Sequence, residues 1–263
     1  MQQRITAAVY GVFHVAMTGK TDPVKQGKKN GENEMKKTRI MRGICYVAGL
    51  LILAMGIILN TKSGLGVSPI ISVSYSIATL TDSNFGNMTF LLYAVFVFVE
   101  LLLHIHMYRT EGESPSGKSM GVQLGMDALQ LPLSLIFTRF MNLFSAWLPE
   151  PEGFGWQLLV LLLGITLTGI GAAMSLDMRI IPNPGDGIVQ TIADTVHQPV
   201  GFTKNCFDLF NICLTIVLSL GFAHHLIGVG LGTVLSVLGV GRVIAAFNAL
   251  FMKKMQGLTG VAR

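Results

Sequence analysis

Ionisable side chains interrupt several long apolar stretches of this sequence, and such positions are candidates for chemistry. The residues concerned are Glu100, Asp127, Arg139, Asp208 and Arg242. A charge in an apolar segment is costly unless it faces a protein interior or a water-filled cavity, where it pairs or serves an ion or solute pathway. These positions therefore favour the binding or passage of a polar solute between packed helices.

Two of these acids belong to narrow polar stripes. Gln123, Asp127 and Gln130 are separated by four and three residues, which confines them to an arc of roughly 60° on a helix. The same spacing recurs in a second set, which is Lys204, Asp208 and Asn211. Each stripe is either a clasp between helices, with Lys204 paired to Asp208, or the wall of a binding site.

Other charged positions have structural explanations. Glu100 and His104, four residues apart near the end of an apolar stretch, are expected to form a pair that reaches toward the surface rather than a proton relay. Arg139, near the end of its own stretch, is expected to extend its guanidinium to the interface.

Arg242 is expected to be one half of a structural charge pair. It lies deep in the run GVGRVIAAF, where an isolated charge costs several kcal/mol. We expect its partner to be an acid such as Asp127 or Asp208.

The elements that carry these residues are membrane spans. Hydrophobic residues make up 51% of the 263 residues and charged residues only 13%, about half the roughly 25% typical of soluble domains. A cytosolic globular protein and a disordered chain are therefore excluded. The stretches long enough to cross a bilayer are 43–61, 88–107, 120–143, 157–177, 203–222 and 226–251.

Two shorter apolar segments, 69–80 and 184–196, are expected to be half-helices. Each begins at a proline that follows turn residues, as the first position of a helix often does. At about 12 residues, each reaches only part of the way across a bilayer at 1.5 Å per residue.

The candidate site lies where the first turns of the half-helices would converge, near the middle of the membrane. Free N–H groups there could hold an anionic or zwitterionic solute. Asp186 either caps its own helix or serves a cation or proton. The expected substrate-binding residues are Asn60, Ser68, Ser72, Asn183, Asp186, Gln190, Asp127 and Asp208.

An internal repeat links the two halves of the chain. At a constant offset of 115 residues, the matched pairs are Gly49 with Gly164, Gly56 with Gly171, Pro69 with Pro184, and Gly86 with Gly201. Each copy holds three spans and one half-helix. Because three is odd, the second copy enters from the opposite side, and such inverted repeats are typical of transporters.

The repeat also gives the expected division of the chain. Residues 1–40 form a flexible basic N-terminal extension, although its first 34 residues could instead include an interfacial amphipathic segment. The first repeat covers 41–145, the second, inverted repeat covers 146–252, and a cytoplasmic tail covers 253–263.

Charge places both termini on the cytoplasmic side. Residues 1–43 hold nine of the 19 lysines and arginines, and the remaining 220 residues carry ten bases and 11 acids. Basic residues also mark the loops 108–118 and 178–204, whereas 144–156 and 223–225 carry none, so the positive-inside rule assigns these last two to the outside. Lys62 is the exception. A nucleic-acid partner is not expected.

Three runs carry a family resemblance. The runs NTKSGLGVSPIISVSYSIATL, FGNMTFLLYAVFVFVELLL and GVGLGTVLSVLGVGRVIAAF resemble the bacterial YczE/YyaS/YitT-type membrane proteins, and the resemblance covers about residues 38–252. It implies a multi-pass protein of the bacterial cytoplasmic membrane and no particular substrate.

The sequence favours a secondary transporter or permease for a small polar solute. The alternatives are a substrate-binding membrane subunit of a larger transport complex, or a non-transporting membrane scaffold. No cofactor, metal site or enzymatic activity is expected, because no nucleotide, nucleophile or metal motif is present. Besides lipid and solute, a second copy could pair through glycine-rich helix faces.

Overall fold

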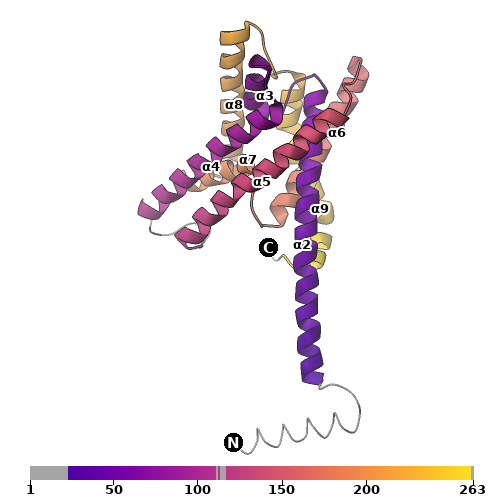
Figure 1. Cartoon of the computed structure of the whole chain (residues 1–263), viewed down its shortest axis with the longest axis vertical. Helices are drawn as coiled ribbons and strands as arrows, with labels where there is room; N and C mark the ends of the chain where they lie inside the picture. The colour runs from indigo at the N-terminus through magenta and orange to yellow at the C-terminus, as the bar shows by residue number, and fades with distance from the viewer. Residues whose placement is uncertain (1–22, 111, 113–116, 262–263) are drawn as a thin grey trace, which may run out of the picture. The chain divides into compact units, whose positions relative to one another are not determined.

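The computed structural model describes residues 23–110, 112 and 117–261, and its regular elements in this range are helices (Figure 1). This confirms the all-α expectation. The helices are α2 (Pro23–Lys62), α3 (Pro69–Leu80), α4 (Phe85–Thr110), α5 (Met120–Trp147), α6 (Phe154–Asp177), α7 (Pro184–Thr195), α8 (Val200–Ala223) and α9 (Leu231–Thr259).

Six of the described helices are long and apolar enough to cross a membrane, with α2 counted from Met35, and the remaining two, α3 and α7, have 12 residues each. The expected set of six spans and two half-helices is confirmed. The last span starts later than expected, at Leu231 instead of 226, because Gly228 adopts φ +76° in the preceding loop. Helix α2 begins at Pro23, within the segment expected to be a flexible extension, and that expectation stays a prediction; residues 1–22 lie outside the described range.

The outward faces of the spans are apolar, as contact with lipid requires. Large exposed side chains include Phe98 on α4, Val217 and Phe222 on α8, and Leu250 on α9. In a soluble protein such a surface would promote association. The chain is therefore an integral membrane protein whose partner on these faces is the bilayer.

The chain divides into two compact units. One comprises Met1–Ile44 with Lys254–Arg263, and the other comprises Cys45–Lys253. In the first unit, Gly260 adopts φ +62° and lies against the methyl group of Thr38. The second unit carries every candidate site residue, and the following description concerns that unit.

The connections gather at two ends of the second unit. At one end, Lys62 forms a salt bridge of 3.1 Å with Glu150, and the Val67 N–H donates to the Gly228 carbonyl at 2.8 Å. We call this the far end. The other, which we call the basic end, carries Arg109, Lys118, Arg179 and Lys204 near the termini of α4 to α8.

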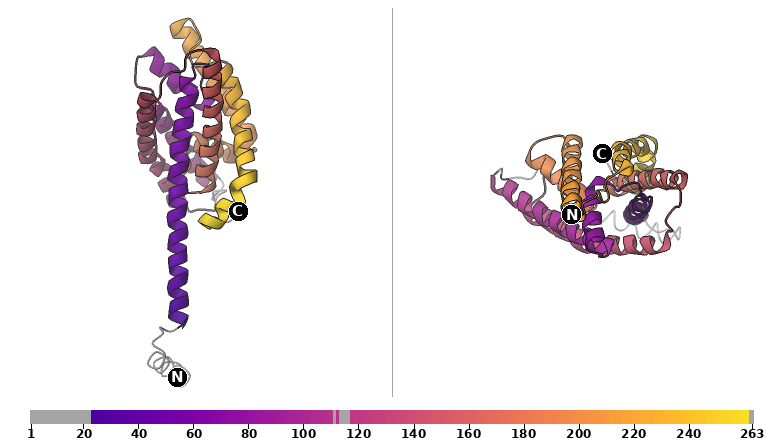
Figure 2. Two further views of the ribbon diagram at one scale, coloured as in Figure 1. Left: turned by 90° about the vertical axis from the view of Figure 1, so that its right-hand side faces the viewer. Right: turned by 90° about the horizontal axis from the view of Figure 1, so that it is seen from above.

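Glycines allow α2 and α6 to pack closely. A Cβ added to Gly171 would lie 2.7 Å from the Gly49 carbonyl oxygen, and one added to Gly164 would lie 3.0 Å from the Gly56 carbonyl oxygen. Only residues without a side chain permit this approach. On its other side α6 meets α9, where Gly169 faces Val243; Figure 2 shows α6 alongside both helices.

Other glycines have open space. No heavy atom lies within 4 Å of a Cβ added to Gly121 or Gly125 at the start of α5, whereas Gly232 at the start of α9 packs against Gly66 and Leu161. Gly232 therefore serves internal packing, and so does Gly239 beside Ile165, whereas Gly241 and Gly257 of α9 have open space. Pairing of two copies through α5 stays a prediction.

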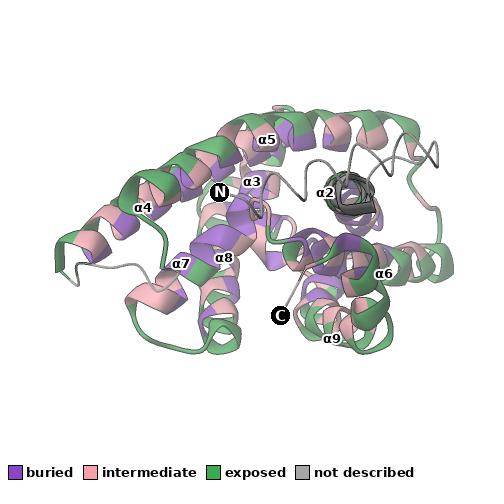
Figure 3. Cartoon of the chain, turned by 90° about the horizontal axis from the view of Figure 1, so that it is seen from below, coloured by how far each residue is buried: buried purple, intermediate pink, exposed green. Residues whose placement is uncertain are grey.

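The half-helices lie within the helix bundle and their first turns meet. A Cβ added to Gly185 in α7 would lie 2.9 Å from the Cδ1 atom of Ile70 in α3. Both helices are largely buried (Figure 3). The expected convergence of the two first turns is therefore present.

The contacts of the two halves are reciprocal. Adding 115 to Gly49 gives Gly164, and subtracting 115 from Gly171 gives Gly56, so the Gly49–Gly171 contact is exchanged with the Gly56–Gly164 contact. The helix pairs follow the same rule, because α3 packs on α8 and α7 packs on α4. A twofold relation requires such reciprocity. The inverted repeat stays a prediction that this pattern supports.

We predict that Gly171→Ala destabilises the protein by about 1–3 kcal/mol, because the new methyl group would press on the Leu53 backbone. Gly125→Ala is the control: its Cβ meets open space, so its effect should be neutral or slightly stabilising. Unfolding in mixed micelles, followed by circular dichroism, measures both. Equal effects would contradict the close packing of α2 on α6.

We also predict that the far end faces outward, because the basic end holds most basic loop residues. In a variant with Cys45, Cys206 and Cys213 replaced by serine, Glu152→Cys should react with an impermeant maleimide applied to intact cells. Gln198→Cys should react only after the membrane is opened. The reverse pattern would overturn this orientation.

Candidate functional site

The first turn of α7 is closed by Asn183. Its side-chain oxygen accepts from the Gly185 N–H at 3.0 Å, and its carbonyl accepts from the N–H groups of Asp186 and Gly187 at 2.9 and 2.8 Å. Asn183 therefore caps α7, a role that was one of two expected alternatives for Asp186. The N–H groups of this turn are already bonded, so it offers no free donors to an anion; capture of an anion by the first turn of α3 stays a prediction.

The polar stripe of α5 faces two ionisable residues of α4. Gln130 donates to the Glu100 carboxylate at 2.6 Å. The Asp127 carboxylate lies 2.7 Å from the His104 Nδ1 atom and accepts a second bond from Gln123 at 3.1 Å. The stripe is thus a clasp between helices, and Asp127 is at the same time part of a site wall.

Glu100 and His104 do not reach the surface as expected. Their exposed fractions are 1% and 6%, because the amide and acid of the α5 stripe hold them inside. Their spacing of four residues is close to the three-residue separation of their partners Asp127 and Gln130 on α5, but the sequence alone does not show that these two helices face each other.

A cavity of about 330 Å³ lies beside the first turns of α7, on the side of the basic end. Glu100, His104 and Asp127 contribute to one wall, and Asp186 and Thr191 to another. The Thr191 hydroxyl is 3.5 Å from the His104 Nε2 atom. Four of these five residues are ionisable, whereas other parts of the lining, such as Met126, Val189 and Ile244, are apolar. The ionisable patch suits a charged or strongly polar group of a solute.

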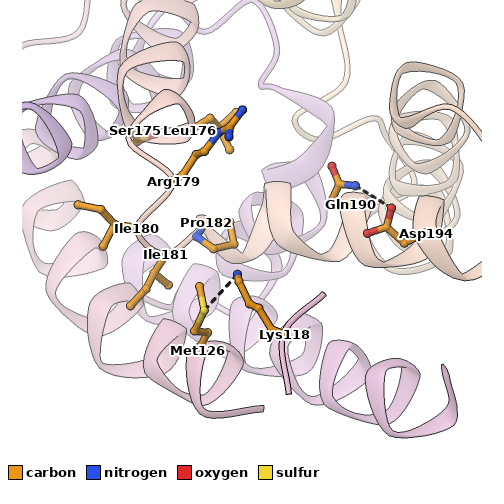
Figure 4. A pocket seen from close by; sticks show the side chains of 10 residues that line it. All are labelled: Lys118, Met126, Ser175, Leu176, Arg179, Ile180, Ile181, Pro182, Gln190 and Asp194. Carbon is orange, nitrogen blue, oxygen red and sulfur yellow. Dashed lines mark hydrogen bonds between the residues drawn. The ribbon is translucent and has the colours of Figure 1, made fainter. Parts of the chain in front are cut away.

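A second hollow of about 640 Å³ adjoins this cavity and shares Lys118, Gln190 and Asp194 with it. Figure 4 shows Lys118 beside Met126, and Gln190 bonded to Asp194. Arg179 also lines the hollow. The cavity therefore has a mouth at the basic end.

The structure brings together part of the expected site. Of the expected substrate-binding residues, three line the cavity: Asp127, Asp186 and Gln190. Asp208 is held by Lys204 of the cavity wall, with 2.7 Å between Nζ and Oδ2. Asn183 lies just behind, beside a small void.

Three expected residues lie elsewhere. Asn60 donates to Ser236 at 2.7 Å between α2 and α9, and Ser72 is 2.7 Å from Thr215 between α3 and α8. Ser68 precedes α3 without a capping bond from its side chain. They are separated from the cavity because the two half-helices run toward opposite ends of the bundle after their first turns meet.

The expected charge pair of Arg242 is not found among the described residues. Arg242 is exposed on α9, and both acids proposed as its partner are engaged, Asp127 by His104 and Asp208 by Lys204. The prediction was wrong because helical spacing shows which residues share a face, but it does not show which face meets the core. Arg139 does reach outward, where it donates to Asn87 at 3.0 Å.

The described residues contain no group of three or more His, Cys, Asp or Glu side chains placed to hold a metal ion.

This architecture defines a polytopic α-helical membrane protein with two half-helices and a cavity lined in part by ionisable residues. The chain belongs to the family of unknown function DUF6198, which matches residues 40–249.

Two relatives agree with this assignment. An uncharacterized protein of Haemophilus influenzae is 28% identical over 201 residues, covering 75% of this chain and 79% of its own. The uncharacterized membrane protein YczE of Bacillus subtilis is 24% identical over 214 residues, covering 80% and 86%. The resemblance drawn from the sequence is confirmed. No solved structure matches the chain.

We predict an energetic coupling of about 1–3 kcal/mol between His104 and Asp127, because the pair is buried and separated by only 2.7 Å. The measurement is a double-mutant cycle of His104→Leu and Asp127→Leu, with unfolding in mixed micelles as the readout. The control is the exposed pair Lys62 and Glu150, changed to Met and Gln, which should couple by no more than about 1 kcal/mol. Equal coupling in both cycles would refute a buried clasp.

Proposed function

We propose that this protein is a secondary transporter for a small polar solute, and that the solute enters through the cavity at the basic end. The observation that carries the proposal is the buried ionisable wall of Glu100, His104 and Asp127 beside the first turn of a half-helix. Stability alone gives no reason to bury such groups, because an apolar contact would be cheaper. Broken helices beside a polar cavity are typical of transport sites.

In the other half, the matching positions between α3 and α8 bond directly to each other, and a hollow of about 320 Å³ lies beside Tyr75 of α3 at the far end. Ser72 lies 2.7 Å from Thr215, and Ser76 lies 3.0 Å from Ser219, between α3 and α8. Shifted by 115 residues, these pairs become Gly187 with Glu100 and Thr191 with His104. All four of these residues line the cavity between α7 and α4.

This correspondence supports alternating access. In the proposed cycle, the α3–α8 contact opens toward the far end while the α4–α7 contact closes around the solute. The two states exchange the conformations of the halves, as expected for inverted repeats. We further propose that the basic end is cytoplasmic, so the structure represents an inward-facing state, and that both termini are cytoplasmic.

Alternating access predicts that a buried position between α3 and α8 becomes reachable from the far end. In a cysteine-free background reconstituted in liposomes, Ser76→Cys should react with an impermeant maleimide applied on that side. Ser74→Cys is the matched control, since Ser74 is equally buried on α3 but bonds to Thr89 of α4 at 3.2 Å. A static scaffold would leave both cysteines unreacted.

The same interface provides a lock. The hydroxyl groups of Ser76 and Ser219 are close enough that Ser76→Cys with Ser219→Cys should form a disulfide. Flux of small amines, amino acids and carboxylates down a gradient is then measured with the variant oxidised and reduced. We expect oxidation to abolish any protein-dependent flux and reduction to restore it. Flux that survives the disulfide would refute this route.

A further inference from the structure

Two buried oxygen atoms beside the cavity have no hydrogen-bond partner among the described residues; Glu100 lines the cavity itself, and Gln130 lines the small void next to it. These are Oε1 of Glu100 and Oε1 of Gln130, neither of which accepts a hydrogen bond from any described residue. Both side chains are 1% exposed. A buried acceptor left unpaired costs about 1–3 kcal/mol. Two such acceptors in one place therefore indicate that a bound molecule supplies the missing donor.

Both oxygens converge on Gly187 in the first turn of α7. A Cβ placed on Gly187 would lie 2.8 and 3.0 Å from the two Glu100 oxygens and 3.1 Å from the Gln130 oxygen. Because Gly187 has no side chain, the carboxylate and amide can approach the helix at the point where the cavity begins. Glu100 and Gly187 both line that cavity.

The same region offers few donors. The N–H groups of Asp186 and Gly187 are used by Asn183, and the Lys204 ammonium lies 2.7 Å from Asp208. Asp186, which also lines the cavity, adds a second carboxylate next to Gly187. Two ammonium groups, from Lys118 and Lys204, also line the cavity, against four carboxylates, from Glu100, Asp127, Asp186 and Asp194. The lining therefore has an excess of negative charge, which an anion would not match.

We propose that Glu100, Gln130 and Asp186 form the subsite for a primary ammonium group of the solute. An ammonium carries three N–H donors and a positive charge, so it can pair with Glu100 Oε1 and Gln130 Oε1 together. The Asp186 carboxylate neutralises the charge from the helix side. The subsite rests on the proposed function in one respect only, namely that the molecule bound there is the transported solute.

Three probes of equal length test the charge requirement. They are 4-aminobutan-1-ol, 1,4-butanediol and 4-hydroxybutanoate, which place an ammonium, a hydroxyl or a carboxylate at one end of the same chain. Binding to the full chain in detergent is measured by thermal shift and by titration calorimetry. We expect the ammonium probe to bind at least tenfold more tightly than the other two. Comparable binding of the diol or the carboxylate, or no binding of the amine, would overturn the assignment.

Variants then locate the subsite. Glu100→Gln keeps the size and the bond to Gln130 but removes the charge, and it should weaken binding of 4-aminobutan-1-ol at least tenfold. Gly187→Ala keeps every charge but places a methyl group against the Glu100 carboxylate, and it should also weaken binding. Glu152→Gln, the same chemical change at the exposed far end, is the control and should leave affinity unchanged.

Controls distinguish a failure of the subsite from a loss of folding and from a failure of the transport proposal. Size-exclusion chromatography and circular dichroism establish that each variant is folded, and a folded Glu100→Gln with unchanged affinity would refute the subsite. The binding assay needs no membrane, so an intact ammonium preference with an ineffective Ser76–Ser219 disulfide would leave the subsite standing while refuting transport. Flux that the disulfide blocks, together with no preference for the ammonium probe, would support transport and refute the subsite.

Discussion

The structure depends on one constraint: two helices end inside the membrane, where backbone groups cannot bond to water. The connections that lead to α3 and α7 must therefore find partners within the protein. The Val67 N–H donates to the Gly228 carbonyl, and the Tyr46 hydroxyl donates to the Ile181 carbonyl at 2.8 Å. Asn183 then closes the first turn of α7. These bonds fix where each half-helix begins, and so they fix which side chains can meet its first turn.

Close packing is the second consequence. Backbones must approach one another to exchange such bonds, and glycine is the residue that permits it. The Gly232 N–H reaches the Leu65 carbonyl at 2.7 Å, and Gly187 lets the Glu100 carboxylate lie against α7. Glycine thus has two roles: at Gly232 it lets the chain bond to the Leu65 carbonyl, and at Gly187 it leaves room for the buried acceptor oxygens of Glu100 and Gln130 beside the cavity.

The sequence carried enough information for the helices but only part of the site. Span length, the prolines at 69 and 184 and the offset of 115 residues depend on local pattern, and the structure has the corresponding helices. Glu100 was misplaced because its partner, Gln130, lies on another helix at 30 positions' distance, and spacing within one helix cannot show that contact. Arg242 failed for the same reason, since its face is set by how α9 packs.

The two halves share their contacts but differ in chemistry, and this difference gives the proposed cycle a direction. Between α3 and α8 the matched positions are hydroxyl groups, which bond to one another and need no solute. Between α4 and α7 they include the Glu100 carboxylate and the His104 imidazole, and a carboxylate cannot be satisfied as a simple hydroxyl pair is. In the proposed cycle, closing the second interface would use a ligand or proton that compensates the carboxylate, whereas closing the first would not. A ligand can shift an equilibrium only by its differential affinity for the two states, and in this protein that differential affinity would come from the charged half alone.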